Sequence, residues 1–229
     1  MADDTPTRVL HAAGPIFAEK GYAASTVREI CTAAGVNVAS VNYHFRDKES
    51  LYLETVHLAH TLRLQQVPPP SWPEETPSDE KLRLFIGAML SRMLGTRELG
   101  WQTRLMMREM FEPTAACRPL VEDFIRPQLK QLLSILDELL SPESEKHERE
   151  QVAFSIVGQC LLYRVAREFV AILVPSEERD AKYGIEQLAE HIADFSMAAL
   201  KNIDGNGLRE NGRGKRTAEN RADKKAVKS

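Results

Sequence analysis

One stretch, residues 26–48 with the sequence TVREICTAAGVNVASVNYHFRDK, most constrains the fold of this chain. Thr26 followed by Glu29 has the spacing of a capping box, in which two side chains satisfy free backbone amides at the start of a helix. Gly35 can adopt the left-handed conformation that closes this helix, and Asn37 is a suitable N-cap for the next one. The stretch therefore predicts two short helices joined by a tight turn, the plan of a helix-turn-helix.

The second of these helices, expected at residues 38–45, has one apolar face. Val41 and Phe45 recur at the helical spacing i, i+4 and are expected in the core. The opposite face would then enter the major groove of DNA, where Ser40 and Asn42 can form hydrogen bonds with base edges or phosphates. An αα-hairpin inside a helical core has a similar composition, so spacing alone leaves that alternative open.

The run from Arg8 to Leu51 contains FAEKGY, TVREI, AAGV, YHF and KE-L in this order. It resembles the N-terminal domain of TetR-family transcriptional regulators, and these motifs together are highly specific. The resemblance implies phosphate contacts by Thr26, Tyr43, His44 and Lys48, and base contacts by Val38 to Ser40 with Asn42. With the N-cap residue included, the candidate DNA-binding residues are Thr26, Asn37, Val38, Ala39, Ser40, Asn42, Tyr43, His44 and Lys48.

The chain departs from the family pattern at the first reading positions. Val38 and Ala39 stand where many members carry a basic residue or Gln, so recognition would depend on contacts with thymine methyls and on DNA shape. Lys48 begins the following helix, where a cation beside free amides suits a phosphate. The net charge is −3 and the motif region is not basic, so we expect few phosphate contacts per subunit.

Composition is that of a soluble globular protein. The chain has 229 residues, of which 43% are hydrophobic and 28% charged, and this length allows one or two domains. No apolar run is long enough to span a membrane, and the N-terminus lacks the pattern of a secretory signal. Three widely spaced cysteines without a CxxC motif predict reduced, buried thiols. We therefore expect a cytoplasmic location and no membrane partner.

Helical periodicity continues along most of the chain and predicts an all-α protein. We expect a three-helix DNA-binding domain at residues 1–50, a helical ligand-binding and dimerisation domain at 51–202, and a disordered basic tail at 203–229. The tail could add non-specific DNA affinity or be a solvated tail without function. The proline-rich segment 67–77 is predicted to be a semi-rigid spacer. Pro127 is expected to kink a long helix and not to end it.

Two long apolar segments, residues 150–174 and 180–200, are each predicted to form a single helix. Such a pair at the end of a helical chain is expected of a homodimer that forms a four-helix bundle. The alternative is that both helices only cover their own domain. Dimerisation is favoured, because a single helix-turn-helix usually needs a two-fold partner to read a palindromic operator in double-stranded DNA.

The segments WQTRLMMREMFEPTAACRPLVEDFIRPQ and GQCLLYRVAR resemble the C-terminal domain of the CecR (CerR-like) subgroup of TetR regulators. The resemblance implies a domain that receives a ligand and dimerises. If the polar side chains project inwards, the ligand-binding residues would be Trp101, Arg104, Arg108, Met110, Phe111, Tyr163 and Arg167. In the alternative interpretation, Arg108 and Arg164 form ion pairs with nearby glutamates and tie helices together.

No nucleophile–base pair, phosphate loop or metal cluster occurs at a useful spacing, so we expect no enzyme activity and no cofactor. His57 and His60 lie one turn apart, but no third metal ligand is evident. The sequence predicts a dimer with its reading helices about 34 Å apart, which acts as a repressor that an unidentified small molecule releases from its operator. The alternative is a ligand-independent DNA-binding or protein-interaction factor on the same fold.

Overall fold

The computed structural model describes residues 5–95 and 100–205, and the side chains within these ranges up to residue 202. The described residues contain helices and no strand, so the predicted all-helical fold class is confirmed. The helices are α1 (Thr5–Ala24), α2 (Val27–Ala34), α3 (Val38–Phe45), α4 (Lys48–Gln66), α5 (Ser78–Leu94), α6 (Trp101–Phe111), α7 (Cys117–Leu120), the π-helical turn η1 (Val121–Ile125), α8 (Arg126–Leu139), α9 (Lys146–Val165), α10 (Arg167–Leu173), α11 (Ser176–Lys182) and α12 (Ile185–Gly205). None of them is long and apolar enough to cross a membrane.

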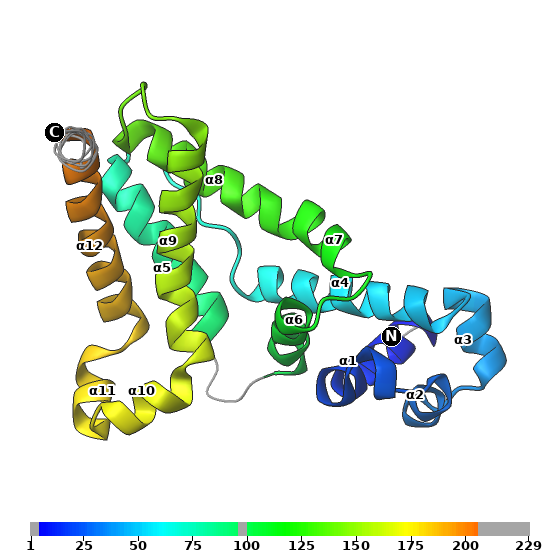
Figure 1. Ribbon diagram of the computed structural model, residues 1–229. Coiled ribbons are helices and arrows are strands. Elements are labelled where there is room, and N and C mark those ends of the chain that lie inside the picture. The colour runs from blue at the N-terminus through cyan, green and yellow to red at the C-terminus, as the bar shows by residue number, and fades with distance from the viewer. Residues whose placement is uncertain (1–4, 96–99, 206–229) are drawn as a thin grey trace, which may run out of the picture.

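One end of the molecule consists of α1, α2, α3 and the first part of α4 (Figure 1). Its core contains the fully buried side chains of Phe17, Ile30, Val41 and Tyr52, and the rings of Phe17 and Tyr52 meet edge to face at 4.8 Å. Helix α6, from the second half of the chain, packs across α1 and α4 and adds Leu105 to this core. The N-terminal core is therefore completed by a helix that lies about fifty residues further along the chain.

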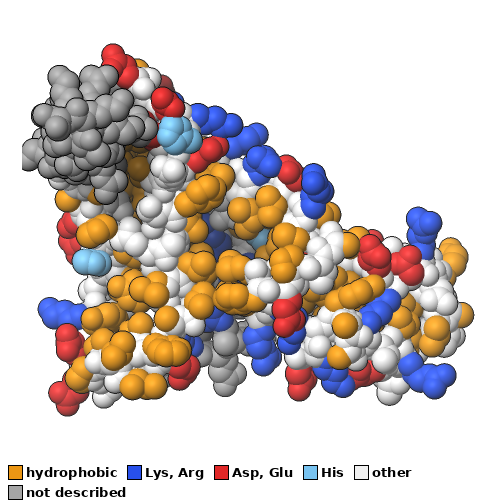
Figure 2. All heavy atoms as spheres, viewed as in Figure 1, with side chains coloured by type: hydrophobic (Ala, Val, Ile, Leu, Met, Phe, Trp, Pro, Cys, Tyr) orange, Lys and Arg blue, Asp and Glu red, His pale blue; other side chains and the backbone are white. Residues whose placement is uncertain are grey.

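A second core fills the other end, where α5, α9 and α12 lie side by side and α8 slopes back towards α4 (Figure 1). The side chains at its centre are aliphatic and fully buried, among them Leu82, Ile86, Leu132, Ile156 and Ile192. Figure 2 shows that hydrophobic side chains also gather on the outer surface over α10 and α11. The predicted boundary at residue 50 falls inside α4, which connects the two ends. The predicted tail from residue 203 lies almost wholly outside the described residues.

The proline-rich segment 67–77 is non-helical, as predicted, but it is docked on the second core. Trp72 packs against that core, and the side-chain amide of Gln131 donates a hydrogen bond to the carbonyl of Pro70 at 2.8 Å. Several prolines limit the conformations of the free segment, so less entropy is lost when it packs.

The prediction of single helices at 150–174 and 180–200 is wrong. The first segment is divided at Ala166, whose backbone (φ −97°, ψ 21°) ends α9 and begins α10. The second begins as the short helix α11, and α12 starts only at Ile185. Apolar periodicity continues across Ala166 without a Gly or Pro, so no local pattern indicated the break between α9 and α10.

Helical conformation in α1 ends at Gly21, which has φ 78° and ψ 173°. The prediction that Pro127 does not end its helix is confirmed. Helix runs through Pro127, since α7, η1 and α8 are continuous from Cys117 to Leu139. The π-helical turn lies directly before Arg126 and Pro127, where a proline removes one backbone donor, and π-turns accommodate such local irregularities.

Candidate nucleic-acid interface and effector domain

The first helix of the motif, α2, is held by a cap at each end. Thr26 Oγ1 accepts a hydrogen bond from the amide of Glu29 at 3.2 Å, so the predicted N-cap is confirmed. The reciprocal half of the capping box is wrong, because the Glu29 carboxylate forms an ion pair with Lys20. At the other end Gly35 has φ 65° and closes the helix in the left-handed conformation, as predicted.

The turn of the motif is fixed by a residue that the sequence analysis did not assign. The guanidinium of Arg8, in α1, donates hydrogen bonds to the carbonyls of Ala34 at 2.7 Å and Gly35 at 3.3 Å. These carbonyls are free at the end of α2, and a cation suits the negative end of a helix. Arg8 thereby holds the turn that sets the direction of α3. The partner lies 26 residues away along the chain, so no local pattern could reveal it.

Helix α3 has the orientation that the helix-turn-helix interpretation requires. Asn37 Oδ1 caps it by accepting from the backbone amide of Ser40 at 2.8 Å and from the Ser40 hydroxyl at 3.0 Å. Val41 and Phe45 are buried, as predicted. The opposite face is open to solvent, and its exposed residues include Val38, Ala39, Asn42, Tyr43 and His44.

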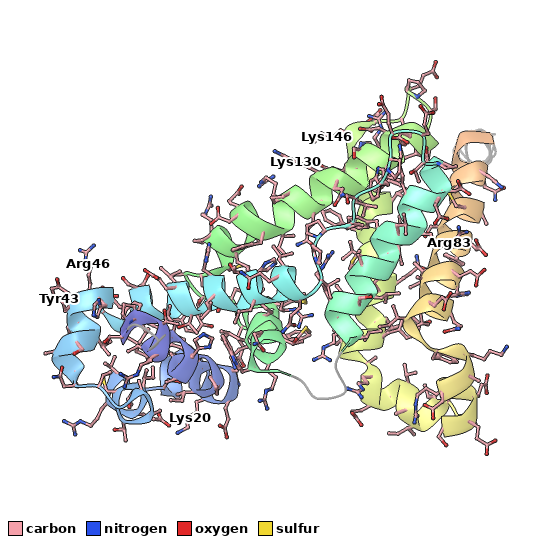
Figure 3. All side chains as sticks on the ribbon, turned by 180° about the vertical axis from the view of Figure 1, so that it is seen from behind. Lys20, Tyr43, Arg46, Arg83, Lys130 and Lys146 are labelled. Atoms are coloured by element: carbon pink, nitrogen blue, oxygen red, sulfur yellow. The ribbon has the colours of Figure 1, made fainter. Side chains whose placement is uncertain are left out.

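Tyr43 is the most prominent side chain of this face, with 84% of its surface exposed. Its ring contacts His44 edge to face, with the centroids 5.0 Å apart. Figure 3 shows Tyr43 and Arg46 at the outer end of the molecule. A phenol in such a position can donate a hydrogen bond to a phosphate or a base edge while its ring packs against sugar.

Arg46 is a candidate contact that the sequence analysis missed. It has φ 65° and ψ −55°, and the amide of Asp47 donates to the carbonyl of Phe45 at 2.7 Å across it, which together describe a γ-turn. This conformation is strained for any residue other than glycine, and such strain clusters at functional sites. The signal in the sequence was an arginine directly after the reading helix. We call the exposed side chains of Val38, Ala39, Asn42, Tyr43, His44 and Arg46 the reading surface.

Lys48 differs from the expectation of a cation beside free amides. The N-terminus of α4 is capped by Asp47, whose carboxylate accepts from the amide of Ser50 at 2.7 Å. This hydrogen bond holds the pKa of Asp47 below its usual range. The Lys48 ammonium lies 4.6 Å above the Tyr22 ring and donates to the carbonyl of Ala23 at 3.3 Å. Lys48 therefore places a cation near the reading surface, held by Tyr22 and Ala23. The expected anion site of cation and free helix amides is not formed, because Asp47 caps the helix.

Comparisons with known proteins agree with this geometry. Residues 9–55 match the model of "Bacterial regulatory proteins, tetR family", and residues 78–200, more than half of the chain, match that of "HTH-type transcriptional dual regulator CecR, C-terminal domain". The chain is a TetR-family transcriptional regulator. It belongs to the subgroup that has the CecR C-terminal domain.

Two curated relatives and one solved structure show how similar the chain is to known proteins. The dual regulator CecR of Shigella flexneri is 24% identical over 68% of this chain and 74% of its own length. The fatty acid metabolism regulator protein of Bacillus subtilis (strain 168) is 23% identical over 85% of this chain and 95% of its own length. The structure of AibR in complex with isovaleryl coenzyme A and operator DNA has a TM-score of 0.57 at 16% identity, and covers 84% of this chain and 97% of that one.

In this TetR-family chain, the ligand-binding residues predicted on α6 lie against the DNA-binding end. The ring of Trp101 occupies the space beside Gly14 in α1. The Arg108 guanidinium donates to the carbonyl of Glu19 at 3.1 Å and forms an ion pair with Glu112 at 2.7 Å, which agrees with the alternative interpretation of helix-tying arginines. Arg104, Met110 and Phe111 are exposed.

The other two predicted ligand-binding residues lie elsewhere in the regulator. Tyr163 and Arg167 line a pocket of about 280 Å³ together with Arg164, Arg179 and Tyr183, among others. The α6 residues do not line this pocket. The structure therefore does not bring the predicted ligand-binding set together, because the spacing of polar residues on two helices cannot tell which element each helix packs against.

Glu109 joins α6 to α4 by a buried network. Its carboxylate accepts from the hydroxyl of Tyr52 at 2.5 Å, from the hydroxyl of Thr114 at 2.8 Å and from the amide of Thr114 at 3.2 Å. Burial and the adjacent carboxylate raise the pKa of Tyr52. The network ties the helix that leads out of the DNA-binding end to the first helix after the 96–99 segment.

The two histidines of α4 contact an aromatic ring in place of a metal site. His60 stacks on Phe124 with the ring centroids 4.1 Å apart, and His57 meets the same ring at 4.9 Å. His60 is 93% buried and its Nδ1 has no hydrogen-bond partner. Within residues 5–95 and 100–205, no three His, Cys, Asp or Glu side chains are grouped so that they could hold a metal ion.

Proposed function

We propose that the protein is a homodimeric repressor in the cytoplasm that binds a palindromic operator through the reading surface and is released by a small-molecule effector bound in the C-terminal domain. The observation that supports DNA binding best is the geometry of α3. Val41 and Phe45 hold one face in the core, Arg8 and Asn37 fix the turn before it, and the opposite face is exposed.

Within the proposed interface, each candidate has a distinct role. Val38 and Ala39 would contact thymine methyls, and Asn42 would form hydrogen bonds with base edges. Tyr43, Arg46 and the neighbouring residues Thr26, His44 and Lys48 would contact phosphates. Ser40 is half-buried and its hydroxyl is directed to Asn37, so both residues would act mainly by holding the start of α3.

A dimer is supported by an apolar surface that the described part of the chain leaves uncovered. On α9, α10 and α12 the exposed large hydrophobic residues are Phe154, Leu162, Val165, Phe169, Ile172, Leu173 and Phe195. Gly158 lies on α9 with open space where its side chain would be, so a second helix can approach closely there. Contiguous exposed apolar surface of this kind marks an interface. A two-fold dimer would hold the two reading helices about 34 Å apart.

Release by an effector is supported by the way the two ends are connected. Helix α4 reaches from the reading end to the second core, and the Tyr52–Glu109 network and Arg108 tie α6 to α4 and α1. A ligand that changes the position of α4 relative to the dimer would change the spacing of the reading helices. The ligand can shift the equilibrium between the two conformations by no more than its differential affinity for them. AibR, which shares the fold, has been crystallised with both isovaleryl coenzyme A and operator DNA.

The test is a titration of the full chain against the DNA upstream of its own gene, with binding sites selected from random DNA as a second source. We expect specific binding that Tyr43→Ala weakens about tenfold or more, since the variant loses one polar contact in each subunit. Lys130→Ala is the matched control, because Lys130 is a surface residue far from the reading surface (Figure 3). With Arg46 and Lys48 as the cations of each subunit, the slope of log K against log salt should be about −4 for the dimer.

The outcomes separate the proposal from its alternative. Equal binding by wild type and Tyr43→Ala would contradict the reading surface. A reporter gene under the selected operator should fall when the protein is present, and a rise would contradict repression. If a broad set of metabolites changes neither DNA affinity nor thermal stability, the ligand-independent factor on the same fold is supported instead.

A further inference from the structure

Three arginines lie where α4, α5 and α9 end. Arg63, Arg92 and Arg164 each occupy the last turn of their helix. Both ribbon views show the C-terminal ends of these helices converging beside α6 (Figures 1 and 3). Arg164 is 92% buried, and the other two are half-buried. We call these three residues the arginine cluster.

The arginine cluster has neutral partners only. Arg63 donates to the hydroxyl of Thr103, and Arg92 donates to the side chain of Gln128 at 3.0 Å and to the carbonyl of Val67 at 3.3 Å. Arg164 forms no hydrogen bond or ion pair with any residue in the described ranges. No carboxylate within these ranges forms an ion pair with any of the three.

The three positive charges also act on one another. Burial and the charge of Arg92 lower the pKa of Arg63, and burial and the charges of Arg63 and Arg167 lower the pKa of Arg164. The charges of Arg63 and Arg92 reach His60 as well. The cluster is therefore one region of positive potential with like charges close together, and burial strengthens their repulsion.

Helix ends do not account for this arrangement. The stabilisation of a cation near a helix C-terminus is much smaller than the free-energy cost of taking an unpaired charge out of water. Elsewhere the same chain gives its buried or half-buried cations an acidic partner: buried Lys81 is paired with Glu138 at 2.8 Å, and half-buried Arg149 with Asp137 at 3.2 Å. The absence of such an acid at the arginine cluster is therefore a local feature.

A second observation points to a missing group. His60 is on the same helix as Arg63, one turn before it, and its buried Nδ1 has no hydrogen-bond partner. A buried polar atom without a partner is uncommon in folded proteins and calls for an explanation. Figure 2 shows the surface hollowed between α9 and α8, with Lys or Arg side chains visible in the hollow. Arg164 also lines the pocket of about 280 Å³ that continues to Leu94, Tyr163 and Leu188.

We propose that Arg63, Arg92 and Arg164, with His60, form the binding site for the oxyanion of the effector, a phosphate or carboxylate on a small organic molecule whose remainder occupies the adjoining pocket. Guanidinium groups match both oxyanions in a bidentate manner. The proposal deepens the proposed effector function and rests on it. It also gives the effector a route to the DNA, since the anion would bridge α4, which leads to the reading surface, and α9, which carries the apolar dimer face.

The test uses the full chain and measures thermal unfolding in inorganic phosphate or pyrophosphate, against chloride at equal ionic strength. At ten times its Kd an anion shifts the folding equilibrium about elevenfold, which raises Tm by roughly 3–6 °C for a chain of this size. Acetate and octanoate form a second arm, so that the two arms distinguish a phosphate from a carboxylate effector. Arg164→Gln should reduce the shift to about a third or less in whichever arm shows it.

The matched control is Arg149→Gln, which lies on the same helix but removes a paired arginine. This variant should have a lower Tm than the wild type and should keep the anion-dependent rise in Tm. Arg164→Gln should instead hold or raise Tm in chloride, because it removes a repelled charge, and weaken anion binding about tenfold or more by calorimetry. A structural role for Arg164 predicts the opposite sign in chloride, and that result overturns the proposal.

The DNA titration is run separately on the same variants, so the two proposals can fail independently. Arg164→Gln should bind operator DNA as the wild type does in chloride buffer. Operator binding without any anion-dependent shift in either arm overturns the oxyanion site and leaves the DNA-binding function intact. An anion-dependent shift that Arg164→Gln removes supports the site even where no operator has been found.

Discussion

The reading surface and the arginine cluster both contain cations without acidic partners, and they differ in exposure to water. Arg46 in the reading surface is open to solvent, where an unpaired charge is fully hydrated and free to meet a phosphate. Arg164 in the arginine cluster is buried, where the same lack of a carboxylate is destabilising. An unpaired cation on the surface is ordinary, whereas one in the interior indicates that something else supplies the negative charge.

The comparison also separates two kinds of recognition. Contacts of the reading surface would be screened by salt and would add up over many weak phosphate contacts. Contacts in the arginine cluster would be few, strong and little affected by salt, because the groups are desolvated and already fixed by Thr103, Gln128 and backbone carbonyls. The regulator would thus combine a broad, salt-sensitive surface for DNA with a compact site for its effector.

The largest effect we expect comes from acidification, at His60. Burial, together with the charges of Arg63 and Arg92, lowers the pKa of His60 to about 4 from 6.5. The unfolded chain then binds more protons than the folded one between these values, so stability falls as the pH drops from 6.5 to 4. The full loss is about 3 kcal/mol, measured as the difference in unfolding free energy between wild type and His60→Asn across this range.

His57→Asn is the control for this prediction, since His57 lies one turn away on the same helix and is exposed. It should alter the pH dependence of the wild type only slightly, because the charge of His57 contributes less to the lowered pKa of His60 than burial, Arg63 and Arg92 do, whereas His60→Asn should flatten it. Equal slopes for His60→Asn and wild type would mean that the interior around the arginine cluster is more hydrated than its burial indicates. The comparison between the two regions would then lose its basis.

A smaller effect should follow from removing an acid that a buried cation does possess. Lys81 is almost fully buried and donates to Glu138 at 2.8 and 2.9 Å, and Ser78 donates to the same carboxylate at 2.6 Å. Glu138→Gln leaves the ammonium with a neutral acceptor and should lower the free energy of unfolding by about 1 kcal/mol. Chemical denaturation of the variant and the wild type measures this difference in the free energy of unfolding. Glu122→Gln, which breaks an exposed pair with Arg126, should change less.

Arg164→Gln, examined beside Glu138→Gln, sharpens the comparison because the two changes should have opposite signs. Both substitutions replace a charged group by the same neutral amide. Loss of stability in both would show that the arginine cluster is neutralised within the folded chain after all.

The sequence predicted the DNA-binding end well because its signals are local. The caps at Thr26 and Asn37, the turn at Gly35 and the spacing of Val41 and Phe45 all act within a few residues, and each is found in the structure. The Lys20–Glu29 ion pair was missed because a capping box and a longer-range pair use the same glutamate. Short-range geometry is what a sequence pattern can express.

The C-terminal domain was harder to predict because its features depend on which helices meet. Trp101 and Arg108 have the spacing of pocket residues, but α6 packs on α1, more than eighty residues earlier in the chain. The arginine cluster draws one residue from each of three helices, and Arg63 and Arg92 carry no motif around them. A single sequence does not indicate which of these distant helices contact one another, so the candidate site could be recognised only in the folded chain.

The smallest effect we expect is at Arg46, and it tests whether the reading surface stores strain for its function. Arg46→Gly relieves the positive φ, which should raise the free energy of unfolding by about 1 kcal/mol or less after the greater entropy of glycine in the unfolded chain is counted. Arg46→Ala keeps the strain and removes the same charge. Both variants should weaken operator binding and reduce the salt slope by about one per subunit. If the glycine variant gains stability over the alanine variant while both lose DNA affinity to the same extent, the γ-turn serves to aim the charge. If glycine gives no such gain, the turn is unstrained and Arg46 is only one more exposed cation.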